Sequence, residues 1–105
     1  SSDFVTAGCI NQVQYLVFQH VIPRHLGYTP GRFTWFYDNI QIYDRHVDFA
    51  KELLERQPID CTPEVYINPD KTNFYDMNQS DIKIIGYPRE EIKSKNPQKK
   101  LEIAI

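Results

Sequence analysis

The chain has 105 residues, a net charge of −2 and a sequence pI of about 5.9. This length suits one small domain, and a balance so close to neutrality argues against broad electrostatic binding to nucleic acid. No apolar run is long enough to cross a membrane, and neither Cys-x-x-Cys nor His-Glu-x-x-His occurs, so no metal site is indicated. The two distant cysteines, Cys9 and Cys61, favour a cytoplasmic protein with free thiols.

A first helix is predicted over residues 10–25, where apolar side chains recur at helical spacing. Apolar residues cover so much of the circumference of this helix that we expect it to be buried. Pro23 should kink or end it, and Gly27 is a suitable stop. Asn11 stands near the expected start, where its side chain could cap backbone N–H groups. The alternative is that its amide, with one donor and one acceptor face, meets a heterocycle.

Further along, aromatic and β-branched residues alternate over residues 33–43 and predict one or two strands with a break at Asp38. A second helix is expected from Asp44 or His46 to about Arg56, because Pro58 prevents its continuation.

The remaining elements are shorter. The sequence predicts strands over residues 63–67 and 82–87, with small helical turns between them. The basic residues of 93–100 are expected in a solvated loop, with an apolar tail after them. Helices mixed with antiparallel-type strands make the predicted fold class α+β.

Several short segments, taken in order, resemble the thymidylate synthase family. They are Ser1-x-Asp3, Asn11 with Tyr15, Gly31-x-Phe33, Ile42-Tyr43-x-x-His46, Glu55-Arg56-Gln57-Pro58, Ile67-Asn68-Pro69, Phe74-Tyr75-Asp76, Ile85-Gly86-Tyr87 and Ile103-Ala104-Ile105. The resemblance covers nearly the whole chain. It implies a mixed sheet packed against helices, with residues 1–105 forming the C-terminal part of the domain and residues 101–105 a mobile tail.

The family converts dUMP to dTMP with 5,10-methylenetetrahydrofolate as one-carbon donor and reductant, by covalent nucleophilic catalysis. The resemblance places the family's cysteine and an arginine upstream of Ser1, so it assigns no catalytic residue to this chain, and the chain alone is predicted to be inactive. It further implies dUMP and folate as partners, a homodimer, no membrane and no nucleic acid.

The resemblance assigns six residues to half of a pocket. On the nucleotide side, Ser1 would bind the phosphate, Asn11 would meet the uracil edge, and Gln41 with Tyr43 would bond the sugar. On the folate side, Asp3 would meet the ring, and Ile105 would carry the terminal carboxylate that closes over it.

Alternatives stay open at this stage. Asp3 could lie in a solvated turn, and Tyr43 could fill the core. Ala7, Cys9 and Gln41 depart from the family pattern and favour a non-catalytic nucleotide-binding or dimerisation module. A related pyrimidine hydroxymethylase is the second alternative, although Asn11 favours uracil over cytosine.

The three histidines, His20, His25 and His46, are expected to be structural or exposed rather than ligands.

Overall fold

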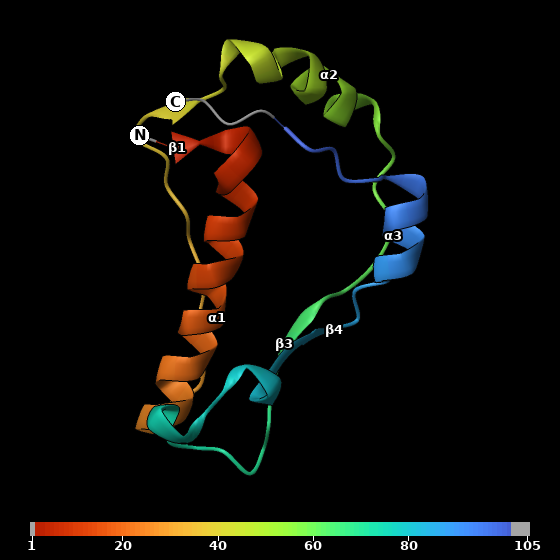
Figure 1. The fold of residues 1–105 in the computed structure, drawn as a ribbon. Helices are drawn as coiled ribbons and strands as arrows, with labels where there is room; N and C mark the ends of the chain where they lie inside the picture. Colours follow the sequence, from red (N-terminus) through yellow and green to blue (C-terminus); the bar gives the residue numbers. More distant parts are fainter. Residues whose placement is uncertain (1, 102–105) are drawn as a thin grey trace. The chain divides into compact units, whose positions relative to one another are not determined.

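The computed structural model describes residues 2–101. Helices in this part of the chain are α1 (Cys9–Leu26), α2 (Val47–Glu55) and α3 (Arg89–Lys95), and its strands are β1 (Ser2–Asp3), β2 (Ile40–Gln41), β3 (Glu64–Ile67) and β4 (Ile82–Ile85) (Figure 1). The chain divides into two compact units. The first unit comprises residues 1–12, 35–60 and 88–105, and the second unit comprises residues 13–34 and 61–87.

The helical run at the start of the chain begins earlier than the sequence pattern predicts. A π-helical segment, η1 (Phe4–Gly8), follows β1 directly and passes into α1 without a break. Asp3 is its N-cap, because the Asp3 carboxylate accepts a hydrogen bond from the Thr6 backbone N–H at 3.5 Å. Asn11 therefore lies inside the helix, which excludes the alternative that it caps the helix.

The other end of α1 matches the prediction closely. Pro23 lies inside the helix, which continues past it to Leu26. Gly27 follows with a φ of 80°, the left-handed conformation that ends helices and that glycine adopts without strain. The backbone N–H of Tyr28 then donates to the Pro23 carbonyl at 2.8 Å, which satisfies one of the free carbonyls at the helix end.

The strands form two ladders of two strands each among residues 2–101. β1 and β2 are parallel, with Ser2 opposite Ile40 and Asp3 opposite Gln41. β3 and β4 are antiparallel, from Glu64 opposite Ile85 to Ile67 opposite Ile82. The α+β class is confirmed, but the described strands do not join into one mixed sheet.

The prediction of strand structure across residues 33–43 is wrong for most of that range. Only Ile40–Gln41 pair, and the residues before them are irregular. A strand needs a neighbour for its backbone N–H and C=O groups, and the described partner, β1, is two residues long. The alternating aromatic residues therefore have high β propensity, but β1 is too short to pair with most of them.

The β3–β4 hairpin in the second unit is tied by polar side chains. Between its strands lie two short 3₁₀ turns, η3 (Phe74–Asp76) and η4 (Gln79–Asp81), and η4 carries a capping box between Asn78 and Asp81. Asp81 is only 7% exposed and accepts from the Asn68 amide at 3.0 Å. These strands and turns match the sequence prediction.

Residues 44–55 also fold as predicted, with a 3₁₀ turn η2 (Asp44–His46) leading into α2. The expectation of a loop over residues 93–100 is wrong in part, because α3 ends at Lys95. Pro88 precedes this helix, Glu90 and Glu91 occupy its first turn, and lysines occupy its last. That order of charges complements the helix dipole.

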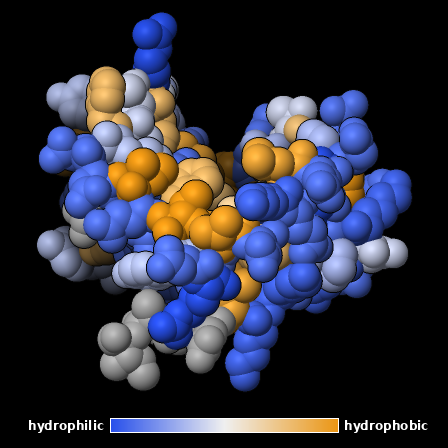
Figure 2. All heavy atoms as spheres, turned by 90° about the horizontal axis from the view of Figure 1, so that it is seen from above, coloured by the Kyte–Doolittle hydropathy of each residue, from blue (hydrophilic) through white to orange (hydrophobic). Residues whose placement is uncertain are grey.

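Large apolar side chains remain at the surface in the part of the chain that the structure describes. Apolar residues appear in orange among hydrophilic ones in Figure 2, and Phe36 and Leu54 are 89% and 88% exposed. α1 is exposed at several apolar positions and fully buries only Val21, so the prediction of a buried helix is wrong for these residues. Within residues 2–101, no helix is both long and apolar enough to span a membrane.

Candidate functional site

The four predicted site residues that the structure describes all belong to the first unit. These are Asp3, Asn11, Gln41 and Tyr43. The β1–β2 ladder sets Asp3 directly opposite Gln41. A residue expected on the folate side thus neighbours one expected on the nucleotide side, although 38 positions separate them in the sequence. Ser1 and Ile105 lie outside the described residues.

Asp3 is held by its own helical segment. Its carboxylate accepts from the Thr6 hydroxyl as well as from the Thr6 backbone N–H. The side chain is half-buried, which contradicts a solvated turn. Two carboxylate oxygens offer about four acceptor positions, so Asp3 keeps acceptor capacity after Thr6 is satisfied.

Asn11 lies one turn into α1 and is half-buried. Its side-chain amide has no hydrogen-bond partner among residues 2–101. A half-buried amide pays a desolvation cost unless it bonds another group. The hydrogen-bonding capacity of the Asn11 amide is therefore unused within the described residues.

Tyr43 follows β2 and is 38% exposed, so it does not simply fill a core. Its ring meets the ring of His46 edge-on, with centroids 5.9 Å apart. The backbone N–H of His46 donates to the Tyr43 carbonyl at 2.8 Å, and His46 itself is only 1% exposed. A buried neighbour of this kind fixes the direction of the Tyr43 ring.

A hydrogen bond that sequence reasoning missed ties α1 to the segment before β2. The Gln12 amide donates to the Tyr37 hydroxyl at 2.6 Å, and the Tyr37 ring packs edge-on against Phe4 and Trp35. Gly8 is buried beside it, and a Cβ at Gly8 would lie 3.1 Å from the Tyr37 hydroxyl. The absence of a Cβ at Gly8 therefore lets the Tyr37 hydroxyl approach the helix backbone closely. The aromatic alternation pointed to Tyr37, but nothing marked Gln12 as its partner.

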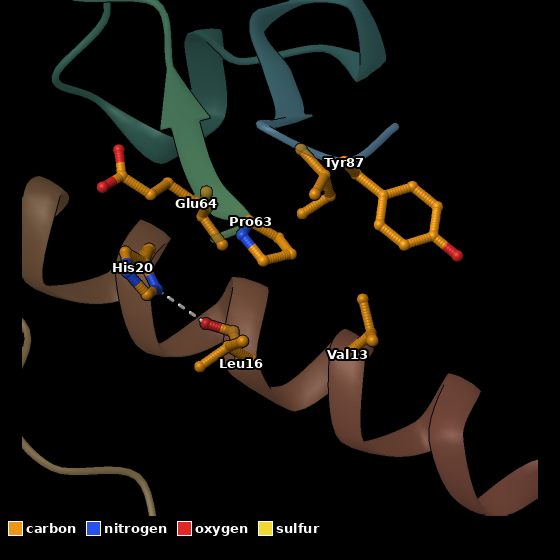
Figure 3. Close-up of a pocket in the computed structure, with 8 residues that line it drawn as sticks. Val13, Leu16, His20, Pro63, Glu64 and Tyr87 are labelled. Atoms are coloured by element: carbon orange, nitrogen blue, oxygen red, sulfur yellow. Dashed lines mark hydrogen bonds between the residues drawn. The ribbon is translucent and has the colours of Figure 1, made fainter. Parts of the chain in front are cut away.

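The second unit contains an apolar cavity of about 870 Å³ (Figure 3). Val13, Leu16 and His20 of α1 face residues of the β3–β4 hairpin across it. His20 Nδ1 lies 2.9 Å from the Leu16 carbonyl oxygen of its own helix. No predicted site residue lines this cavity, and its walls are mainly aliphatic and aromatic. We therefore place the candidate site in the first unit, where the polar chemistry lies.

His25 and His46 both contact other residues of the chain. His25 accepts from the Phe74 backbone N–H at 2.9 Å, and His46 is buried against Tyr43. Both cysteines are free and exposed. Among residues 2–101, no three His, Cys, Asp or Glu side chains are grouped to hold a metal ion.

Comparison with known proteins gives the family. A family model described as thymidylate synthase matches residues 1–98. Thymidylate synthases of Streptococcus thermophilus and Streptococcus mutans are 41% and 40% identical to the chain over 106 aligned positions. Each match covers the whole chain but only 35% and 36% of the relative, so the chain spans about a third of their length. With a match over nearly all of its residues, this chain belongs to the thymidylate synthase family.

Proposed function

We propose that this chain supplies one side of the active-site pocket of a thymidylate synthase that converts dUMP to dTMP with 5,10-methylenetetrahydrofolate. In this proposal, residues 1–105 are the C-terminal part of the domain, and the nucleophilic cysteine belongs to the part of the protein outside them. The observation that carries the proposal is the β1–β2 register, which sets Asp3 opposite Gln41. One short ladder thereby joins the folate side and the nucleotide side.

Asn11 selects the base in this proposal. Its carbonyl accepts from uracil N3–H while its NH₂ donates to O4, and cytosine presents the opposite polarity at both positions. A half-buried amide with no hydrogen-bond partner among residues 2–101 supports this role. Discrimination follows because a mismatched base would leave buried polar groups unpaired.

Gln41 and Tyr43 bind the sugar. Both lie at the end of the first unit's parallel ladder, and neither side chain has a hydrogen-bond partner among residues 2–101. A glutamine can bond a hydroxyl as donor or acceptor but carries no proton at neutral pH. Gln41 therefore orients the sugar without taking part in proton transfer.

Asp3 binds the folate ring through acceptor positions that Thr6 leaves available. Methylenetetrahydrofolate supplies the one-carbon unit and the reducing electrons when bound, and these residues hold and orient it. We further propose that Ser1 contacts the nucleotide phosphate, that Ile105 carries a carboxylate that closes over the folate, and that the protein is a cytoplasmic homodimer.

A chimera tests this function. The chain replaces the matching 35% of the Streptococcus thermophilus enzyme, and the product is assayed for dihydrofolate formation from dUMP and methylenetetrahydrofolate. We expect turnover that falls at least tenfold with Asn11→Ala. The exposed Gln14→Ala on the same helix is the control and should keep full turnover. A folded chimera without turnover, or one unaffected by Asn11→Ala, would contradict the proposal.

A further inference from the structure

The helical residues 4–12 of the first unit are attached to the segment that leads into β2 at two points. At the start of the helical run, the β1–β2 ladder pairs Asp3 with Gln41. Further along the helix, the Gln12 side-chain amide donates to the Tyr37 hydroxyl at 2.6 Å. Because Tyr37 lies shortly before Gln41 in the chain, the same two segments are joined at both ends of this stretch of helix.

Tyr37 lies against one face of these helical residues. Phe4, Gly8 and Gln12 follow one another at intervals of four, which places them in a row along the helix. The Phe4 ring meets the Tyr37 ring edge-on, with centroids 6.0 Å apart. Gly8 is buried, and a Cβ there would lie 3.1 Å from the Tyr37 hydroxyl. Gln12 completes the row with its hydrogen bond, so the whole row faces one tyrosine.

The hydrogen bond restricts the helix in a way that the apolar contact does not. Apolar attraction has no preferred direction, so the packing of Phe4 on Tyr37 tolerates a small turn of the helix about its axis. A hydrogen bond weakens steeply when its donor no longer points at the acceptor. The bond from Gln12 to Tyr37 therefore resists that turn, and both side chains are half-buried, where such a bond is stronger than in water.

We propose that Gln12 and Tyr37 are positioning residues, whose hydrogen bond sets the rotation of helical residues 4–12 and thereby the direction of the Asn11 amide. Asn11 adjoins Gln12 in the helix, so a turn that moves one side chain moves the other. This inference rests on the proposed function, because it assumes that Asn11 meets the uracil. Gln12 and Tyr37 act only through Asn11 and do not touch the nucleotide.

The rotation of the helix is measured first without substrate, on the 105-residue chain. Residual dipolar couplings of the Cα–Hα bonds in residues 9–12, compared with those of α2 in the same unit, report how the helix is turned. Tyr37→Phe removes the hydroxyl and keeps the ring, so it should change these couplings and shift the side-chain amide resonance of Gln12. Tyr28→Phe removes a hydroxyl from a side chain that is 72% exposed, and this control should change neither.

The α2 amides show whether each variant is folded. Unchanged couplings in folded Tyr37→Phe would overturn the inference, even where the Gln12 resonance shifts.

Variants of Gln12 test the same bond from its other side. Gln12→Met keeps the length of the side chain and loses the amide, so it should change the couplings as Tyr37→Phe does. Gln12→Glu can accept a hydrogen bond from the Tyr37 hydroxyl, so it should keep the parent couplings only while that hydroxyl is present. Parent couplings in Gln12→Met, or equal couplings in Gln12→Glu with and without Tyr37→Phe, would overturn the inference. If Tyr37→Phe does not fold, the comparison of Gln12→Met with Gln12→Glu decides the question.

In the active chimera, Tyr37→Phe should raise the KM for dUMP about three- to fivefold and leave the KM for methylenetetrahydrofolate unchanged. In an Asn11→Ala background the same change should have no further effect, because the hydrogen bond acts through Asn11. Gln14→Met makes the Gln12→Met change at an exposed position of the helix and should alter neither KM.

An equal rise in both KM values, no rise in either, or an equal effect with and without the Asn11 amide would overturn the positioning role. A chimera that is inactive before substitution would contradict the proposed function instead. In that case the dipolar couplings still decide whether the bond between Gln12 and Tyr37 sets the rotation of the helix.

Discussion

Asn11 does not cap the helix, because the helical run begins at residue 4. An asparagine shortly after a glycine and before an apolar-periodic run is typical of a cap, because asparagine, aspartate, serine and threonine all favour that position. Asp3 takes that role instead, and its carboxylate bonds Thr6, three residues on. The half-buried amide of Asn11 makes no hydrogen bond to another side chain or to the backbone among residues 2–101.

Asn11→Asp in the active chimera should shift the preference from dUMP toward dCMP. A protonated or water-bridged aspartate can meet cytosine N3 and its amine, whereas the ionised form repels uracil O4. Loss of a good base-edge bond should weaken dUMP binding by about 1–3 kcal/mol. Calorimetry with both nucleotides measures this change. Gln14→Glu makes the same charge change on the same helix and should leave the dUMP-to-dCMP ratio unaltered.

Gly8 and Tyr37 should be energetically coupled. Alanine gains helix propensity over glycine, but its Cβ would come 3.1 Å from the Tyr37 hydroxyl, which Gln12 holds in place. In a Tyr37→Phe background the obstacle is gone. Gly8→Ala should therefore be about 0.5–1 kcal/mol more favourable there than in the parent. Urea unfolding of the four proteins in the cycle gives this difference, and additive values would show that the close approach costs nothing.

At the scale of elements, two glycines with left-handed backbone differ in their surroundings. Gly86, after β4, has a φ of 74°, and an added Cβ would lie 2.6 Å from the Thr62 carbonyl oxygen. Gly27, after α1, has a φ of 80°, and a Cβ there would meet nothing within 4 Å. Gly27→Ala should cost about 1 kcal/mol from backbone strain alone. Gly86→Ala should cost about 2–4 kcal/mol because backbone must also move. Equal costs in denaturant unfolding would contradict the steric argument.

The hairpin should lose stability in acid through Asp81. A hydrogen bond from Asn68, a backbone N–H from Asn78 and the nearby charge of Lys71 lower the Asp81 pKa below its ordinary 3.8. A lowered pKa favours the folded state above the ordinary value, and that contribution disappears as the pH falls through the folded pKa. Protection of the β3–β4 amides should therefore fall below about pH 4. Asp81→Asn should remove this dependence, whereas Asp70→Asn, in the same loop, should keep it.

Sequence patterns predicted those elements whose stability is local. α1 and α2 have helical spacing with proline or glycine near their ends, and β3 and β4 are short runs bounded by turn residues. The strand predicted over residues 33–39 is absent, because a strand needs a partner to pair with. The spacing of aromatic residues in one segment does not show whether such a partner exists. α3 was not predicted, because a basic run is typical of a solvated loop. The order of its charges, acidic in the first turn and basic in the last, is the feature that is typical of a helix. The pairing of Asp3 with Gln41 depends on register between distant segments, which no local pattern encodes.

At the scale of the whole molecule, the exposed apolar residues agree with a chain that spans about a third of its relatives. Two-stranded ladders are marginal by themselves and usually gain stability from neighbouring strands or helices. Apolar residues such as Phe36 and Leu54 are suited to burial against further parts of such a domain.

The chain alone should form no dihydrofolate from dUMP and methylenetetrahydrofolate. The resemblance gives it binding residues but no nucleophile, and Cys9 lies exposed at the start of α1 rather than at the family cysteine. Absorbance at the dihydrofolate band follows the reaction, with Cys9→Ser as the control for contaminating enzyme. Turnover by the parent chain that Cys9→Ser abolishes would show that Cys9 can act as the nucleophile.

The uninterrupted helical run of residues 4–26 has a consequence for insertions and deletions. Asp3 caps this run and Asn11 lies inside it. The helical backbone between them, first π-helical and then α-helical, therefore fixes both their separation along the axis and their angular phase. Removing one residue from the wider π turn of Phe4–Gly8 would make the helix more regular. It would also rotate the Asn11 side chain about the helix axis, so that it no longer has the same direction relative to Asp3. Substitutions in this turn can be tolerated where a change of length cannot.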